Sequence, residues 1–178
     1  TSGVMVATKT DRAHAGLSVL FAAHDIDRLY IALTRCAPDP RRGTVASLIG
    51  RSSHDRKKMA VLRTGGREAV THYSADIAYG PPERPYAARI ACRLETGRTH
   101  QIRVHLASIG APVLCDALYG SGQPAAPVRQ AVAEAGITRQ ALHAAVLGFR
   151  HPVSGALLRF QTPLPPDMTA LEALLSVL

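Results

Sequence analysis

The sequence has no tryptophan, few other aromatic residues and no long apolar run. Its three cysteines, Cys36, Cys92 and Cys115, are far apart and form no CxxC pair, which argues against a disulfide framework and a zinc site. No apolar stretch approaches the ~20 residues that a transmembrane helix needs, and no signal peptide is recognisable. We therefore predict a protein of the reducing cytoplasm with no membrane partner and no bound metal.

Acidic residues are also scarce: the 178 residues include 13 aspartates and glutamates but 21 lysines and arginines. The formal net charge is therefore +8. Apolar residues make up 47% and charged residues 19% of the chain, a composition typical of globular proteins. The length suffices for one domain with a sizeable core. Such a basic domain suits a polyanion such as nucleic acid, although a basic protein without that partner carries the same charge.

Hydrophobic periodicity predicts many short strands and a few helices. We expect a buried strand at residues 4–7 and further strands at 28–33, 44–49, 58–62, 69–75, 86–94, 140–149 and 156–160. Gly65 and Gly66 are predicted to close a hairpin between two of them. Helices are expected at 11–24, capped by Thr10, at 99–109 and at 168–175. The pattern indicates an α+β domain with a mixed, largely antiparallel sheet and flanking helices.

The densest group of candidate functional residues lies at positions 94–105, Leu-Glu-Thr-Gly-Arg-Thr-His-Gln-Ile-Arg-Val-His. A strand ends there, a glycine turns the chain and a helix begins, with Arg98 at the junction, where a helix N-terminus favours anions. His100 and His105 are five residues apart, whereas a zinc pair on one helical face needs a spacing of four. Two interpretations stay open, a buried structural turn or an anion or carboxylate site built on Arg98.

A second basic group lies between residues 51 and 67, where Asp55 is the only acid. Its members are Arg51, Arg56, Lys57, Lys58, Arg63 and Arg67. They suit sequence-independent contacts to phosphates, although a solvated hairpin has the same composition.

Tyr30 is a further candidate. It alternates with Leu29 and Ile31, so it points away from their face, either into a cleft or into ordinary packing.

The string at 96–105, Thr-Gly-Arg-Thr-His-Gln-Ile-Arg-Val-His, is very similar to the signature of RluA-like RNA pseudouridine synthases. Further segments resemble the same family in the same order. Residues 1–10 resemble the end of its catalytic loop and the following strand, and 28–33 resemble its tyrosine motif. Residues 110–120, with Asp116 and Tyr119, resemble the stretch after the signature helix, and 139–143, 151–152 and 163–165 resemble its C-terminal strands.

The resemblance implies a pseudouridine synthase catalytic domain over residues 1–178 that isomerises uridine in structured RNA, either ribosomal large-subunit RNA or tRNA, without cofactor or metal. It implies that Arg98 holds a catalytic aspartate bidentately and keeps it ionised. It also implies that Tyr30 stacks on a base flipped out of the RNA helix. From charge, and not from a motif, we expect the basic residues at 51–67 to contact the RNA backbone.

The family pattern places the aspartate in a His-Arg-Leu-Asp stretch two residues before Thr-Ser-Gly, whereas Thr1 is the first of the 178 residues. We expect the domain to be incomplete at its N-terminus, these residues alone to be inactive, and the intact protein to be active. Asp116 is expected to be structural, and Cys115 stands where the family usually has glycine. The alternatives are a non-catalytic RNA-binding module and a basic structural domain. The pattern predicts neither the target uridine nor the oligomeric state.

Overall fold

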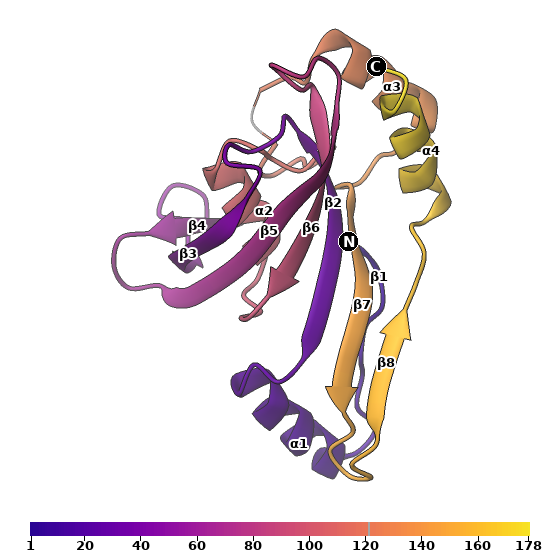
Figure 1. The fold of residues 1–178 in the computed structure, drawn as a ribbon. Helices are drawn as coiled ribbons and strands as arrows, with labels where there is room; N and C mark the ends of the chain where they lie inside the picture. The colour runs from indigo at the N-terminus through magenta and orange to yellow at the C-terminus, as the bar shows by residue number, and fades with distance from the viewer. Residues whose placement is uncertain (121) are drawn as a thin grey trace.

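The computed structural model describes residues 1–120 and 122–178, and an eight-stranded sheet forms its centre (Figure 1). The strands are β1 (Ser2–Gly3), β2 (Asp27–Arg35), β3 (Arg42–Arg51), β4 (Met59–Leu62), β5 (Arg67–Tyr79), β6 (Ala87–Leu94), β7 (Leu142–Arg150) and β8 (Leu157–Gln161). Their order is β1-β7-β2-β6-β5-β3-β4, with β8 also on β7. Only β1 and β7 pair in parallel among these strands, so the predicted α+β class with a largely antiparallel sheet is confirmed.

Four helices accompany the sheet in the described part of the chain: α1 (Asp11–Ala22), α2 (Gln101–Ser108), α3 (Ala126–Ala135) and α4 (Pro166–Leu175). Figure 1 shows α1 near one end of the sheet and α3 beside α4 at the other end. The main core joins β2, β5 and β6 to α2, α3 and α4, and its fully buried side chains include Leu33, Ile90, Leu106, Met168 and Leu171. None of the helices formed by residues 1–120 and 122–178 has the length and apolarity to cross a membrane.

Local signals place most of these elements. Thr10 is the N-cap of α1, since its hydroxyl accepts a hydrogen bond from the backbone N–H of Ala13 at 3.2 Å, as its position predicted. Along β6, Ala88, Ile90 and Cys92 are fully buried and Arg93 is exposed, which follows the predicted alternation. Helix α3 was not predicted, because its alanine-rich sequence follows a proline-containing loop and shows only a short apolar face.

The predicted buried strand at residues 4–7 was wrong. Met5 is 87% exposed, and Val4 and Val6 are only half-buried. The reason is competition for one strand edge: β1 pairs with His143 and Ala144 of β7, and β8 occupies β7 from Val146 onward. The Val4 N–H still donates to the Ala144 carbonyl oxygen at 3.0 Å, and the chain then leaves the edge of β7, which β8 occupies from there on.

The predicted hairpin around Gly65 and Gly66 was also wrong, although both of its strands form. β4 and β5 do not pair with each other, because each pairs antiparallel with an opposite edge of β3. The connection between them passes over β3, and a Cβ atom on Gly66 would lie 3.0 Å from the Leu48 backbone. Periodicity identifies strands, but it does not identify their partners.

Candidate functional site

The turn between β6 and α2 places Arg98 beyond the C-terminal end of β6, an inner strand that lies between β2 and β5. The Nε atom of Arg98 donates to the Glu68 carbonyl oxygen at 2.8 Å, and its backbone N–H donates to Oε1 of Gln101 at 2.9 Å. Within the described residues, the two terminal amino groups of Arg98 make no hydrogen bond or ion pair. A planar guanidinium anchored through Nε alone keeps two parallel donors for a carboxylate.

A cavity of about 330 Å³ brings Arg98 and Tyr30 together, although 68 positions separate them in the chain. Thr1, Gln101 and Arg103 contribute to the same lining. Tyr30 is half-buried, and burial raises the pKa of its phenol, partly offset by the positive charge of Arg28. The tyrosine therefore presents a neutral ring, which suits stacking on a nucleobase.

A second cavity of about 620 Å³ adjoins the first, since Arg98 and His100 line both. Arg51, Lys57 and Arg67 of the predicted basic group line this second cavity. Arg56, Lys58 and Arg63 do not contribute to its lining. The structure thus places part of the basic group next to Arg98, and we call the two cavities, which share Arg98 and His100 in their walls, the basic cleft.

A buried ion pair supports the floor of the first cavity. Arg103 donates from Nε and from one terminal nitrogen to the two carboxylate oxygens of Asp116, both at 2.7 Å. Burial by itself raises the pKa of Asp116, but the hydrogen bonds from Arg103, Leu118 and Tyr119 outweigh it and lower that pKa. Asp116 is therefore ionised and held by four hydrogen bonds, which fits the structural role expected for it.

His100 connects the two cavities to the stretch after α2, which sequence reasoning missed when it weighed this histidine only as a zinc ligand. Its backbone is left-handed, with φ of 58°. The Tyr119 hydroxyl accepts from the Met59 backbone N–H at 2.8 Å and shares a hydrogen bond of 2.8 Å with Nδ1 of His100. Burial, followed by the charge of Arg103, lowers the pKa of His100, so its ring is neutral. The available signal was the joint presence of His100 and Tyr119 in two adjacent motifs.

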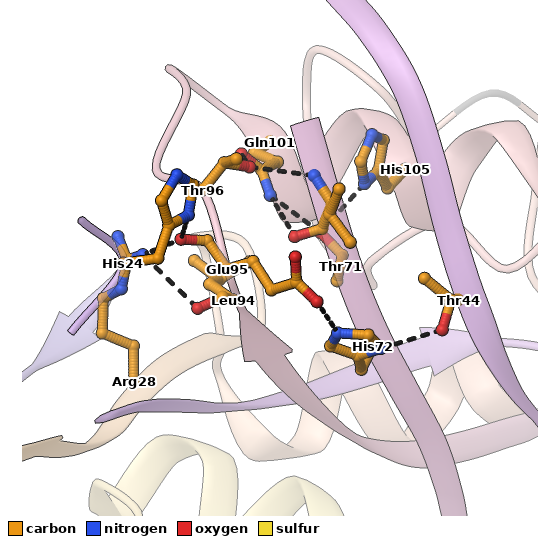
Figure 2. Close-up of polar contacts among 11 residues, drawn as sticks. His24, Arg28, Thr44, Thr71, His72, Leu94, Glu95, Thr96, Gln101 and His105 are labelled. Carbon is orange, nitrogen blue, oxygen red and sulfur yellow. Dashed lines mark hydrogen bonds and ion pairs between the residues drawn. The ribbon is translucent and has the colours of Figure 1, made fainter. Parts of the chain in front are cut away.

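Gln101 is a second residue that sequence reasoning missed, and Figure 2 shows it at the centre of a buried polar network. The side-chain Oε1 accepts from the Thr96 hydroxyl at 2.7 Å, in addition to the Arg98 N–H. Its Nε2 donates to the carbonyl of Val70 and the hydroxyl of Thr71, both at 3.0 Å. With 2% exposure, this carboxamide ties the turn of Arg98 to β5.

His105 continues the network away from the cavity. Its Nδ1 contacts the Thr71 hydroxyl at 2.9 Å, and its Nε2 contacts the Ser47 hydroxyl of β3 at 2.9 Å. Burial lowers the pKa of His105 to about 4, so the ring is neutral and links α2 to two strands. His100 and His105 thus engage different partners.

Comparison with known proteins adds an independent observation. The family model described as RNA pseudouridylate synthase matches residues 1–108. The chain is 45% identical over 179 residues to a protein of Zymomonas mobilis named ribosomal large subunit pseudouridine synthase D, an alignment that covers 99% of this chain and 54% of the relative. A protein of Xanthomonas campestris with the same name is 44% identical, and the alignment covers 98% of this chain and 52% of that protein.

The fold has solved counterparts. It is similar to the human RNA pseudouridylate synthase domain containing 4, with a TM-score of 0.71 and 22% identity over 93% of this chain and 68% of that one. It is also similar to the human RNA pseudouridylate synthase domain containing 1, with a TM-score of 0.68 and 25% identity over 92% of this chain and 65% of that one. The chain spans about half the length of the curated relatives described above.

Proposed function

Because this chain belongs to the RNA pseudouridylate synthase family, we propose that it forms the core of an enzyme that isomerises uridine to pseudouridine in structured RNA. Two bacterial relatives carry names that refer to the ribosomal large subunit, which favours ribosomal RNA over tRNA as the substrate. The cleft gives this proposal a physical basis, because it combines an arginine fork, a neutral aromatic ring and several cations.

The observation that carries the proposal is the position of Thr1 in the same cavity as Tyr30 and Arg98. The resemblance places the catalytic aspartate two residues before Thr1, and two residues of extended chain span at most about 7 Å. We therefore propose that the intact protein supplies this carboxylate at the mouth of the cavity, within reach of the two unpaired amino groups of Arg98. The resulting bidentate pair keeps the carboxylate ionised in a partly desolvated site.

In the reaction, the N1–C1′ glycosidic bond of uridine breaks, the base turns, and a C5–C1′ bond forms. A proton leaves C5, and N1 gains one. The carboxylate acts at the sugar, either by attack or by proton removal, while Tyr30 stacks on the freed base and prevents its escape. The uridine reaches the cavity only after flipping out of its helix.

The cations of the basic cleft are proposed to hold the RNA backbone beside the nucleotide that enters the cavity of Tyr30 and Arg98. We propose that Arg51, Lys57 and Arg67, which line the second cavity, contact the phosphates that flank the flipped nucleotide. We propose that Arg56, Lys58 and Arg63, which lie outside the lining, contact the RNA backbone farther along. These contacts are electrostatic, so they add affinity and orientation without reading sequence.

Tritium release from RNA labelled at C5 of uridine tests the function directly, because the reaction removes that hydrogen. The intact protein is expected to release tritium from a stem-loop fragment of large-subunit ribosomal RNA. Binding of the same RNA without tritium release would instead support the alternative, a non-catalytic RNA-binding module. Absence of both, at low salt, would leave only a structural domain.

A further inference from the structure

Arg28 is a buried cation beneath the turn that carries Arg98. It is 6% exposed, and one terminal nitrogen donates to the carbonyl of Glu95 at 2.7 Å and to that of Leu94 at 3.3 Å (Figure 2). Its guanidinium lies over the ring of Phe21 in α1, 5.4 Å from the ring centre. The contacts of Arg28 therefore tie β2 and α1 to the last residue of β6 and to the residue that follows it.

Burial of the Arg28 guanidinium has an unfavourable desolvation free energy, so the side chain needs a structural or functional explanation. Among the residues described, Arg28 forms no ion pair, and its buried Nε has no hydrogen-bond partner. A buried charge without a counterion carries a desolvation cost that two carbonyl contacts offset only in part. A neutral side chain could fill the same space at a lower cost.

Gly97 fits around the guanidinium of Arg28. A Cβ atom on Gly97 would lie 2.6 Å from a terminal nitrogen of Arg28, and of the described residues other than its own chain neighbours only Arg28 comes within 4 Å of that position. The backbone at Gly97 does not have a positive φ, so its conformation would accept an alanine, but the new Cβ would require the buried end of the Arg28 side chain to shift. Gly97 and Arg28 are thus complementary in shape.

The other end of the turn is held by Gln101. Its carboxamide binds the Arg98 N–H and the Thr96 hydroxyl, and it fixes both to β5. Arg98 therefore lies between two anchors, with Arg28 under the residues before it and Gln101 after it. Neither residue offers a free charge to the cavity, because the Arg28 guanidinium is bound to backbone carbonyls and the Gln101 carboxamide is neutral.

We propose that Arg28 is a positioning residue that, together with Gln101, sets the direction of the Arg98 guanidinium toward the catalytic carboxylate. This inference rests on the proposed function, because it gives Arg98 a carboxylate to hold. Arg28 acts through the turn and touches neither RNA nor the reacting atoms. Its contact with Gly97 makes the two positions interdependent.

The test is a double-mutant cycle in the intact protein, with tritium release as the assay. Arg28→Ala and Gly97→Ala are each expected to lower kcat by roughly tenfold with little change in KM, because the turn shifts while the RNA contacts remain. With Arg28 removed, the new Cβ at position 97 meets open space, so the double variant should lose about tenfold and not the roughly hundredfold that independent effects would give. Multiplicative losses would overturn the proposal.

Two controls separate positioning from damage to the fold. Gly16→Ala places a Cβ 2.4 Å from Pro152, away from the cavity, and should lower the melting temperature while kcat is retained. Arg89→Ala removes another arginine whose Nε is buried and unpaired, but it lies against Glu172 of α4 and should also spare kcat. If Arg28→Ala does not fold by circular dichroism, Arg28→Lys takes its place, because lysine withdraws the terminal nitrogen from Gly97.

The pH profile gives a readout that a merely structural role would not move. A displaced Arg98 stabilises the carboxylate less, so the acid limb of kcat should shift to higher pH in Arg28→Lys, in the same direction as in Arg98→Lys. If the wild-type protein releases no tritium, the proposed function itself fails, whereas full activity and an unshifted limb in Arg98→Lys would defeat the pairing of Arg98 with the carboxylate, and this inference with it. If Arg98→Lys loses activity and shifts the limb while Arg28→Lys leaves it in place, the function stands and this inference is overturned.

Discussion

Arg103 of α2 holds Asp116 through two parallel hydrogen bonds of 2.7 Å, and the side chain of the aspartate has no exposed surface. The pair fixes the stretch after α2 beneath the cavity of Tyr30 and Arg98. Oδ1 of Asp116 also accepts from the backbone N–H groups of Leu118 and Tyr119, so four hydrogen bonds hold this carboxylate in place. In the proposed reaction, the catalytic carboxylate is a different residue.

Breaking that pair should destabilise the protein strongly. Asp116→Asn leaves the Arg103 charge buried without its counterion, and we expect a loss of about 3–5 kcal/mol in the free energy of unfolding by urea titration. The pKa of Asp116 is lowered in the folded state, so its contribution is present above the unfolded value, roughly pH 4, and is lost as pH falls through the folded value. Asp116→Asn should remove that acid-side slope, and an unchanged slope would contradict this account.

His105 should make the free energy of unfolding depend on pH between about 4 and 7. Its folded pKa of about 4 lies below the unfolded value of roughly 6.5, so the unfolded chain binds the extra proton between these pH values. Stability should therefore fall by about 2–3 kcal/mol as pH is lowered from 7 to 4 and change little further from this group. His105→Gln should flatten this region of the pH–stability curve, whereas a variant that keeps the full slope would show that another group causes it.

Tyr30 should separate stacking from the role of its hydroxyl. Tyr30→Phe keeps the aromatic face, so we expect this variant to retain RNA affinity. Tyr30→Ala removes the face, so we expect its kcat to fall further than that of Tyr30→Phe, by roughly a hundredfold or more. The matched control is Tyr73→Phe, which loses a hydroxyl bonded to the Pro40 carbonyl away from the cavity and should retain activity. Equal activity of Tyr30→Ala and the wild-type protein would remove Tyr30 from the site.

If the basic cleft contacts phosphates, its cations should contribute to the salt dependence of RNA affinity. Replacing Arg51, Lys57 and Arg67 together by glutamine should weaken affinity and lower the slope of log K against log salt by about 0.7–0.9 for each lost phosphate contact. The control replaces three exposed cations on or next to α1 and at the end of β7, Lys9, Arg12 and Arg150, and changes net charge by the same amount. Equal slopes in the two triple variants would mean that binding follows net charge and not the cleft.

Local patterns predicted much of this fold, and long-range contacts account for what they missed. The N-cap at Thr10 and the alternation around Ile90 depend on neighbours in the chain, so the sequence shows them directly. The failed strand at residues 4–7 depended on which segment occupies the edge of β7, and the failed hairpin depended on β3 having two free edges. No periodicity carries that information.

The candidate site divides in the same way. Arg98 stood out because a long motif surrounds it, and Tyr30 because it alternates with apolar neighbours. Their presence in one cavity depends on the pairing of β2 with β6, which places the tyrosine beside the end of the strand that leads to Arg98. The contact of Arg28 with Gly97 and the buried carboxamide of Gln101 had no local signature, because each is defined by partners from other strands.

The most direct test of the central claim is tritium release from C5-labelled RNA by the intact protein and by its Arg98→Lys variant. A lysine keeps the charge but has no fork to hold a carboxylate bidentately, so we expect kcat to fall by at least about a hundredfold with RNA affinity nearly unchanged. That result would support Arg98 as the partner of the catalytic carboxylate. Near-normal turnover by Arg98→Lys would contradict the account.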